Sequence, residues 1–211
     1  MELRTRRTEV TRKRERGRYD EQTVHAILDE APICHVGFAR DGTPFVLPTI
    51  HARIGSHLYL HGSTASGMLT TLKDGAAVCV TATIVDGLIL ARSAMHHSMN
   101  YRSVVVIGNA TAVSDTGEKL RALRAVVEHV TPGRWDEVRA PSGKELASTL
   151  VLRVPIMEAS AKIRTGPPID DDEDYALPIW AGEVPLQMRF LEAVADTEGL
   201  DPPPSVRQLL Q

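Results

Sequence analysis

The segment of residues 47–68, "LPTIHARIGSHLYLHGSTASGM", decides the fold that we predict for this chain. Two apolar-rich runs flank a turn at Gly55, and the second run leads into a cluster of Gly, Ser and Thr beside His61. Such runs on either side of a short turn are typical of an antiparallel hairpin. A hairpin with a purely structural role needs no histidine or small hydroxyl residues at its end, so the same segment also indicates a functional site.

Short apolar runs separated by turn residues continue on both sides of this hairpin. The strongest turn signals are Asp41-Gly42 and Asp86-Gly87, because Asp-Gly favours the left-handed conformation of tight hairpin turns. We expect antiparallel strands at residues 33–39, 45–53, 57–61, 76–85, 88–95, 103–113 and 149–161. Six to seven short strands favour a closed barrel over an open sheet, because closure removes exposed strand edges.

Helices are expected at three places around these strands. Apolar residues recur every three or four positions over residues 20–31, where Asp20 can cap the helix and Pro32 ends it. A short helix is expected over residues 68–73, and an amphipathic helix begins at Thr116. The predicted fold class is therefore mainly β with flanking helices.

The length of 211 residues and the composition bound the domain organisation. One core is expected, with a barrel domain over residues 19–165, a basic N-terminal arm over 1–18 and an irregular C-terminal tail over 166–211. No apolar run reaches the roughly 20 residues of a membrane helix, and no secretory signal is recognisable. Cys34 and Cys79 lie in separate apolar runs, as buried reduced thiols do. We therefore expect a cytoplasmic protein without membrane contact.

The net charge of −3 conceals a basic start and an acidic run, "DDDED", at residues 170–174. A basic arm can bind nucleic acid. The rest of the chain is acidic and lacks a helix-turn-helix, a zinc finger or a basic face with interleaved aromatic residues. We therefore expect no nucleic acid, and interpret the arm as solvated or docked on a partner subunit or on the acidic loop.

Several common chemistries have no pattern here. Adjacent His96 and His97 would point to opposite sides of a strand, His51 and His61 lie on different strands, and neither cysteine has a CxxC partner, so no metal site is expected. The Gly-x-Ser-x-Gly frame of a serine nucleophile is missing. Glycine-rich nucleotide fingerprints are missing too.

Two polar clusters remain as candidates for ligand binding. In the first, Gly62, Ser63, Thr64, Ser66 and Gly67 precede a helix, where free amides and the helix dipole favour a phosphate. Simple N-capping of the helix by a hydroxyl is the alternative. In the second cluster, residues 96–103 precede a strand, and Arg102 could bind the same phosphate through two hydrogen bonds.

Four short motifs occur in a recognisable order. They are "PFVLPT" at residues 44–49, "LYLHGS" at 58–63, "NYRSVVVIGNA" at 100–110 and "GPPIDDDEDYALPIWAGEVPL" at 166–186. Their order and spacing resemble the flavin-nucleotide-binding branch of the pyridoxamine 5′-phosphate oxidase-like superfamily, which includes nitroimidazole-resistance reductases. The resemblance implies an FMN-binding split β-barrel and a homodimer with one FMN in each of two clefts between subunits.

The resemblance also implies which residues meet the cofactor. The strand with Pro48, Thr49, Ile50 and His51 would lie along the isoalloxazine ring, and the phosphate would lie in the polar loop. The implied FMN-binding set is Pro48, Thr49, Ile50, His51, His61, Gly62, Ser63, Thr64, Ser66, Tyr101, Arg102, Ser103 and Trp180. The oxidases have a basic pair where this chain has Gly67-Met68, so Arg102, Lys73, Lys162 or Arg53 would have to meet the phosphate charge.

The expected function is an FMN-dependent oxidoreductase that passes electrons from a reduced nicotinamide to a small organic acceptor. His51 and His61 are the only candidates for a catalytic proton donor, because a histidine titrates near neutral pH. A structural role is the alternative for each. Other functions that stay open are a non-catalytic flavin-binding regulatory or storage protein, a haem protein with His96 or His97 as ligand, and a deazaflavin-binding split barrel.

Overall fold

The computed structural model describes residues 2–197 and 199–211. Its strands are β1 (Gly17–Arg18), β2 (Cys34–Arg40), β3 (Thr43–Thr49), β4 (His51–Ile54), β5 (His57–Ser63), β6 (Asp74–Leu90), β7 (Ser98–Ala112), β8 (Thr149–Pro155), β9 (Ala159–Arg164) and β10 (Gly182–Pro185). Its helices are α1 (Glu21–Glu30), α2 (Gly67–Leu72), α3 (Thr116–Val130), α4 (Gly143–Ser148) and α5 (Pro204–Leu209). Four 3-10 turns are η1 (Arg14–Arg16), η2 (Ala94–His96), η3 (Arg134–Glu137) and η4 (Asp172–Ala176).

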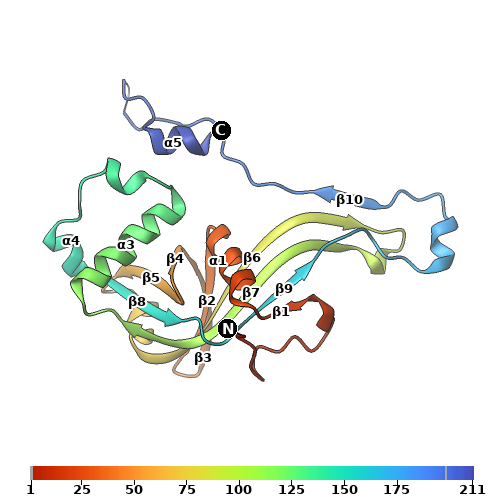
Figure 1. The fold of residues 1–211 in the computed structure, drawn as a ribbon, viewed down its shortest axis with the longest axis horizontal. Helices are drawn as coiled ribbons and strands as arrows, with labels where there is room; N and C mark the ends of the chain where they lie inside the picture. Colours follow the sequence, from red (N-terminus) through yellow and green to blue (C-terminus); the bar gives the residue numbers. More distant parts are fainter. Residues whose placement is uncertain (1, 198) are drawn as a thin grey trace.

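The sheet is antiparallel and curls around one core (Figure 1). Its main path has the order β3-β2-β6-β7-β8-β5-β4, and the helices lie around it. The turn between β2 and β3 has the expected form, because Asp41 and Gly42 both have positive φ. The prediction of a mainly β split barrel with flanking helices is confirmed.

The core is formed by apolar side chains from strands and helices together. Leu28 of α1, Leu60 of β5, Leu69 of α2, Val104 of β7 and Leu152 of β8 are all 0% exposed. At about 25 cal/mol per Å², burial of such side chains is the main stabilising contribution. No helix in the described ranges combines the length and the apolar character that crossing a membrane requires.

The hairpin turn expected at Asp86-Gly87 is wrong, because β6 runs straight through it. The register against β7 shifts between Val85 and Gly87, so Asp86 is the extra residue of a β-bulge. A Cβ atom on Gly87 would lie 3.1 Å from the carbonyl oxygen of Val184 in β10. The glycine therefore allows the tail to approach closely rather than forming a turn.

Two further expected strands are each divided in two. Residues 45–53 form parts of β3 and β4, which pair with different neighbours, β2 and β5. Residues 149–161 include β8 and the start of β9, which are separated after Pro155 because proline has no N–H for the ladder. In addition, β6 joins two expected strands, and β1 and β10 were not expected, so the described residues form ten strands instead of six or seven, without a change of fold class.

The N-terminal arm is docked on its own barrel. Leu3 is 0% exposed, and its carbonyl accepts a hydrogen bond from the N–H of Ala159 at 3.0 Å. Arg7 binds the carboxylate of Glu158, and β1 pairs with β9. The basic residues of the arm thus flank a segment that belongs to the folded domain.

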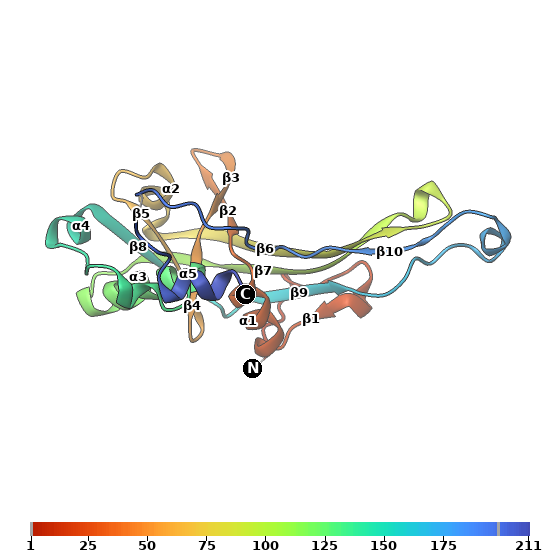
Figure 2. The same cartoon turned by 90° about the horizontal axis from the view of Figure 1, so that it is seen from above.

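The β6–β7 ribbon projects beyond the barrel, and the C-terminal tail returns along it (Figure 2). β10 pairs with β6 through the register Glu183 to Ile89. Farther on, α5 is held against η3, where the N–H of Ser205 donates to Glu137 at 3.0 Å. The tail therefore contains regular elements that its composition did not predict.

Candidate functional site

One cleft gathers a large part of the predicted cofactor site. This β3–β5 cleft has a volume of about 530 Å³ and lies between β3, the end of β5 and the start of α2. Its lining residues are Phe38, Arg40, Phe45, Leu47, Pro48, Thr49, His61, Gly62, Ser63, Ser66, Gly67 and Met68. The predicted residues Pro48, Thr49, His61, Gly62, Ser63 and Ser66 are among them, whereas Ile50 and Thr64 are not.

The hydroxyl residues of the polar loop hold its backbone. Ser63 Oγ accepts from the N–H of Ala65 at 3.1 Å. Ser66 Oγ accepts from the N–H of Leu69 at 3.4 Å and is the N-cap of α2. The capping role that the sequence left open for Ser66 is therefore present, and the hydroxyls lie in the wall of the cleft as well.

Arg40 is the cation of the β3–β5 cleft, and the sequence analysis missed it. Its guanidinium lies 4.8 Å from the ring centre of Phe45 and has no carboxylate partner among the residues that the structure describes. Side chains alternate along a strand, so Arg40 lies on the same face of β2 as Phe38. This two-residue spacing was the sequence signal that could have placed Arg40 in the cleft. A Cβ atom on Gly67 would lie 2.9 Å from Arg40 Nη1, so the glycine keeps space beside this cation.

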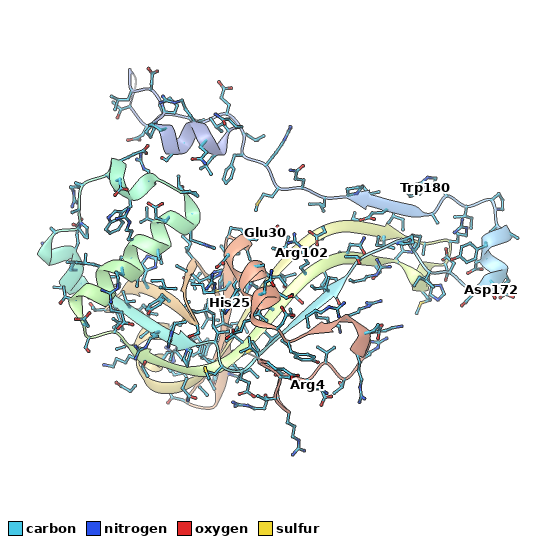
Figure 3. All side chains as sticks on the ribbon, in the orientation of Figure 1. Arg4, His25, Glu30, Arg102, Asp172 and Trp180 are labelled. Carbon is cyan, nitrogen blue, oxygen red and sulfur yellow. The ribbon has the colours of Figure 1, made fainter. Side chains whose placement is uncertain are left out.

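Arg102 lies in a different cleft. It hydrogen-bonds Glu30 at the end of α1, and its Nη2 donates to Asp86 Oδ1 at 2.7 Å (Figure 3). These two carboxylates raise the pKa of Arg102 above its ordinary value. The cleft around it, about 550 Å³ in volume, shares no lining residue with the β3–β5 cleft. Within one chain the structure does not bring Arg102 to the polar loop.

The other residues of the second cluster also lie away from the β3–β5 cleft. Tyr101 pairs with Arg164 in the β7–β9 ladder, and Ser103 Oγ donates to the carbonyl oxygen of Lys162 at 3.3 Å. Trp180 lies on the tail beside the ribbon and is 65% exposed (Figure 3). These side chains do not join the polar loop within a single chain.

His51 lies inside the protein and away from the cleft. It is 0% exposed, its Nε2 lies 2.9 Å from the carbonyl oxygen of Leu28, and its ring centre is 4.8 Å from that of His129. Burial lowers the pKa of His51 to about 4, so the ring is neutral at pH 7. This geometry fits the structural alternative for His51.

His61, unlike His51, lies at the edge of space that is large enough for a ligand. It lines the β3–β5 cleft and also a second cleft beside α3. Its Nδ1 is buried and has no hydrogen-bond partner in the described part of the chain. Burial lowers the pKa of His61, which favours the neutral imidazole.

The structure also groups three side chains that the sequence spacing did not reveal. Ligand atoms of His96, Asp170 and Asp174 lie within 4.8 Å of one another near the tip of the ribbon. Asp170 is already bound by Arg92, at 3.0 Å from Nη1 to Oδ2. A positive charge next to the carboxylate disfavours a cation there, so the cluster is interpreted as part of the ribbon's own support.

Comparison with protein families identifies the origin of this arrangement. The family model for pyridoxamine 5′-phosphate oxidase matches residues 20–163, which include the barrel strands and the polar loop. The chain belongs to the pyridoxamine 5′-phosphate oxidase-like split-barrel superfamily. The resemblance inferred from the four motifs is confirmed. A comparison with curated proteins finds no match.

Solved members of this superfamily include two that are similar over nearly the whole chain. The flavocytochrome Anf3 from Azotobacter vinelandii has 40% identity and a TM-score of 0.91, with 99% of both chains covered. An FAD and haem binding protein from Mycobacterium smegmatis has 36% identity and a TM-score of 0.88, with 92% of this chain and 97% of the other covered. A protein assigned to 5-nitroimidazole antibiotic resistance from Bacteroides thetaiotaomicron has 26% identity and a TM-score of 0.57, with 70% and 86% covered.

Proposed function

We propose that this chain is a flavin-dependent oxidoreductase that binds both a flavin and haem. The observation that carries the proposal is the 40% identity to a flavocytochrome over 99% of the chain. When bound, a flavin supplies hydride and one-electron chemistry and haem supplies one-electron chemistry, while the protein positions them. A reduced nicotinamide is the proposed electron donor, and a small organic molecule is the proposed acceptor.

The β3–β5 cleft is the proposed flavin site. The residues fit a flavin in two respects, since Pro48 and Thr49 offer the backbone of a strand to its polar ring edge and the loop offers small hydroxyl residues to its phosphate. Arg40 supplies the positive charge that the missing basic pair does not. His61 is the histidine that lines this cleft.

FAD is favoured over the FMN expected from the sequence. Only one arginine without a carboxylate partner lines the cleft in the described ranges, so the phosphate receives little charge. FAD can compensate by burying its adenosine moiety. The relative from Mycobacterium smegmatis, which is 36% identical, is described as binding FAD.

We also propose a homodimer that completes the flavin site. Tyr101, Arg102, Ser103 and Trp180 are placed apart from the polar loop within one chain. A second copy is the way in which these residues could meet the flavin, as the resemblance implies. Val46 of β3 and Trp180 are 67% and 65% exposed, as expected of residues that a second copy covers. The free thiols of Cys34 and Cys79 fit the proposed cytoplasmic location.

The proposal is tested by the absorbance spectrum of the purified protein and by chromatography of the released flavin. We expect flavin bands together with a Soret band, FAD as the released species, and bleaching when NADH or NADPH is added without oxygen. Released FMN would correct the form of the cofactor. A colourless protein that takes up neither added flavin nor haemin would overturn the proposal, and a bound flavin that no nicotinamide reduces would indicate a non-catalytic binding protein.

Paired arginine variants test the location of the flavin. Arg40→Ala is expected to weaken flavin binding by roughly 10- to 150-fold, because a hydrogen bond to a charged group contributes about 1.5–3 kcal/mol. Riboflavin, which lacks the phosphate, should lose much less. Arg102→Ala tests the dimer, since a similar loss is expected only where Arg102 of a second copy reaches the phosphate.

A further inference from the structure

A second cleft lies beside α3 on the outer side of the barrel. This α3 cleft has a volume of about 440 Å³, within the range of small-molecule sites. Its apolar wall consists of Leu123, Val126, Val127, Trp135, Val138 and Pro141. The first three belong to α3, and the other three belong to the segment between α3 and α4. Figure 1 shows this segment leaving α3 and returning to α4.

The strand β5 presents one histidine to this apolar space. Alternate residues Leu58 and Leu60 are 0% exposed and point into the barrel core. Tyr59 and His61 therefore lie on the opposite face, where Tyr59 packs with Ala122 of α3. His61 is the one histidine in the α3 cleft among the residues that the structure describes.

The state of this imidazole suits coordination of a metal. A histidine ring nitrogen is a common protein ligand of iron. Nδ1 is buried without a partner among the described residues, so the ring is not committed to a hydrogen bond there. A lone histidine beside an apolar wall is a set of residues that would hold a haem, with the histidine on the iron and the apolar side chains against the porphyrin.

The rim of the cleft carries a group that recognises carboxylates. Arg139 holds the carboxylate of Glu145 through two hydrogen bonds, of 2.8 and 2.6 Å. Both residues line the α3 cleft and are largely exposed. To bind a haem propionate at the water-facing edge of the cleft, this guanidinium would have to exchange the Glu145 carboxylate for the propionate.

We propose that the α3 cleft is the haem site and that His61 is the iron ligand. This inference rests on the proposed function, which supplies haem as a cofactor, and it adds the site and the ligand. His61 also lines the β3–β5 cleft. One side chain would therefore separate the haem site from the flavin site.

The other candidates for the haem ligand have less suitable surroundings. His97 Nδ1 lies 3.0 Å from the carbonyl oxygen of Ser93, and His96 Nδ1 lies 3.8 Å from Asp170 beside Arg92. His51 is fully buried and hydrogen-bonded to Leu28. None of these three histidines lines the α3 cleft.

The test is a haemin titration of the full-length protein, followed by absorbance and electron paramagnetic resonance. His61→Ala is expected to raise the dissociation constant for haemin roughly 10-fold or more and to shift the Soret band. Added imidazole should restore the wild-type spectrum by occupying the vacated position. His61→Met guards against misfolding, because a folded variant with a thioether ligand should bind haemin with a different spectrum.

His57→Ala and His97→Ala are the matched controls, and both should leave the spectrum unchanged. Val138→Trp, at the rim of the cleft, should weaken haemin binding without removing a ligand. A wild-type Soret band in folded His61→Ala, or its loss in His97→Ala, would overturn the inference and leave the proposed function intact. If the wild-type protein takes up no haemin while its flavin bands persist, the haem part of the proposed function fails together with this inference.

Discussion

The barrel and the C-terminal tail use similar apolar residues but bury them differently. In the barrel, Leu60 and Leu152 are 0% exposed, whereas Phe190, Leu191 and Val194 of the tail are 58, 70 and 95% exposed. Strand pairing and helix packing cover the barrel residues with the same chain. The tail is attached through β10, through α5 and through the ion pair between Asp170 and Arg92, but much of its apolar surface lacks a covering. The barrel therefore covers its own apolar residues, whereas the tail leaves apolar surface that the proposed second copy would cover.

The largest effect is expected when a leucine is replaced by alanine in each of the two regions and the free energies of unfolding are compared. Leu60→Ala should lower the free energy of unfolding by about 2–5 kcal/mol, because it leaves a cavity in the core. Leu191→Ala should change it by less than about 0.5 kcal/mol, because the side chain is 70% exposed. Urea unfolding of both variants measures this, and equal losses would show that the tail is part of the cooperative core.

The pH dependence of barrel stability should reveal the buried His51. Burial lowers its pKa from 6.5 to about 4, so as the pH falls through this window the unfolded chain takes up a proton before the folded one does. Stability is full above about pH 6.5 and is lost progressively toward about pH 4, by up to about 3 kcal/mol.

His51→Gln keeps a donor for the Leu28 carbonyl and removes the titration. The unfolding free energy of this variant should fall less with decreasing pH than that of wild type. His57→Gln serves as the control. The assignment fails if the profiles of His51→Gln and wild type have the same slope.

Removal of residues 186–211 should separate the two regions. The unfolding free energy should fall by about 1–2 kcal/mol, because the Leu186 hydrogen bond to Asp86 and the Ser205 hydrogen bond to Glu137 are lost. The barrel should stay folded, and the proposed dimer should dissociate. Light scattering after size exclusion measures the mass, and a truncated chain that stays dimeric would place the interface elsewhere.

The smallest effect concerns the cysteines, and it leaves stability untouched. Burial raises the pKa of Cys34 to about 12, so its thiol should react with a disulfide reagent only when the barrel unfolds. Cys79 is half-buried and should react sooner. Mass spectrometry of partially labelled protein gives the order, and early labelling of Cys34 would mean that the barrel opens locally.

Local sequence signals predicted the elements that local physics determines. Asp20 caps α1 as predicted, and Asp41 and Gly42 form the predicted tight turn. The spacing of apolar residues correctly predicted α3. The same Asp-Gly signal failed at Asp86, because the approach of β10, nearly a hundred residues away, made it a bulge. Arg40 was missed since only the closed barrel places it beside Gly67.

The sequence by itself therefore determined the superfamily, the mainly β fold class and the polar loop at the end of β5. These features depend on hydrophobic periodicity, turn residues and the order of motifs. Each of these signals can be recognised from residues that are close together in the sequence. Only the tertiary structure decided the partners of the charged and titratable groups. It paired Arg102 with Glu30 and Asp86, buried His51, and placed His61 between two clefts. Such partners come from distant strands and helices, so their contacts depend on how the sheet closes.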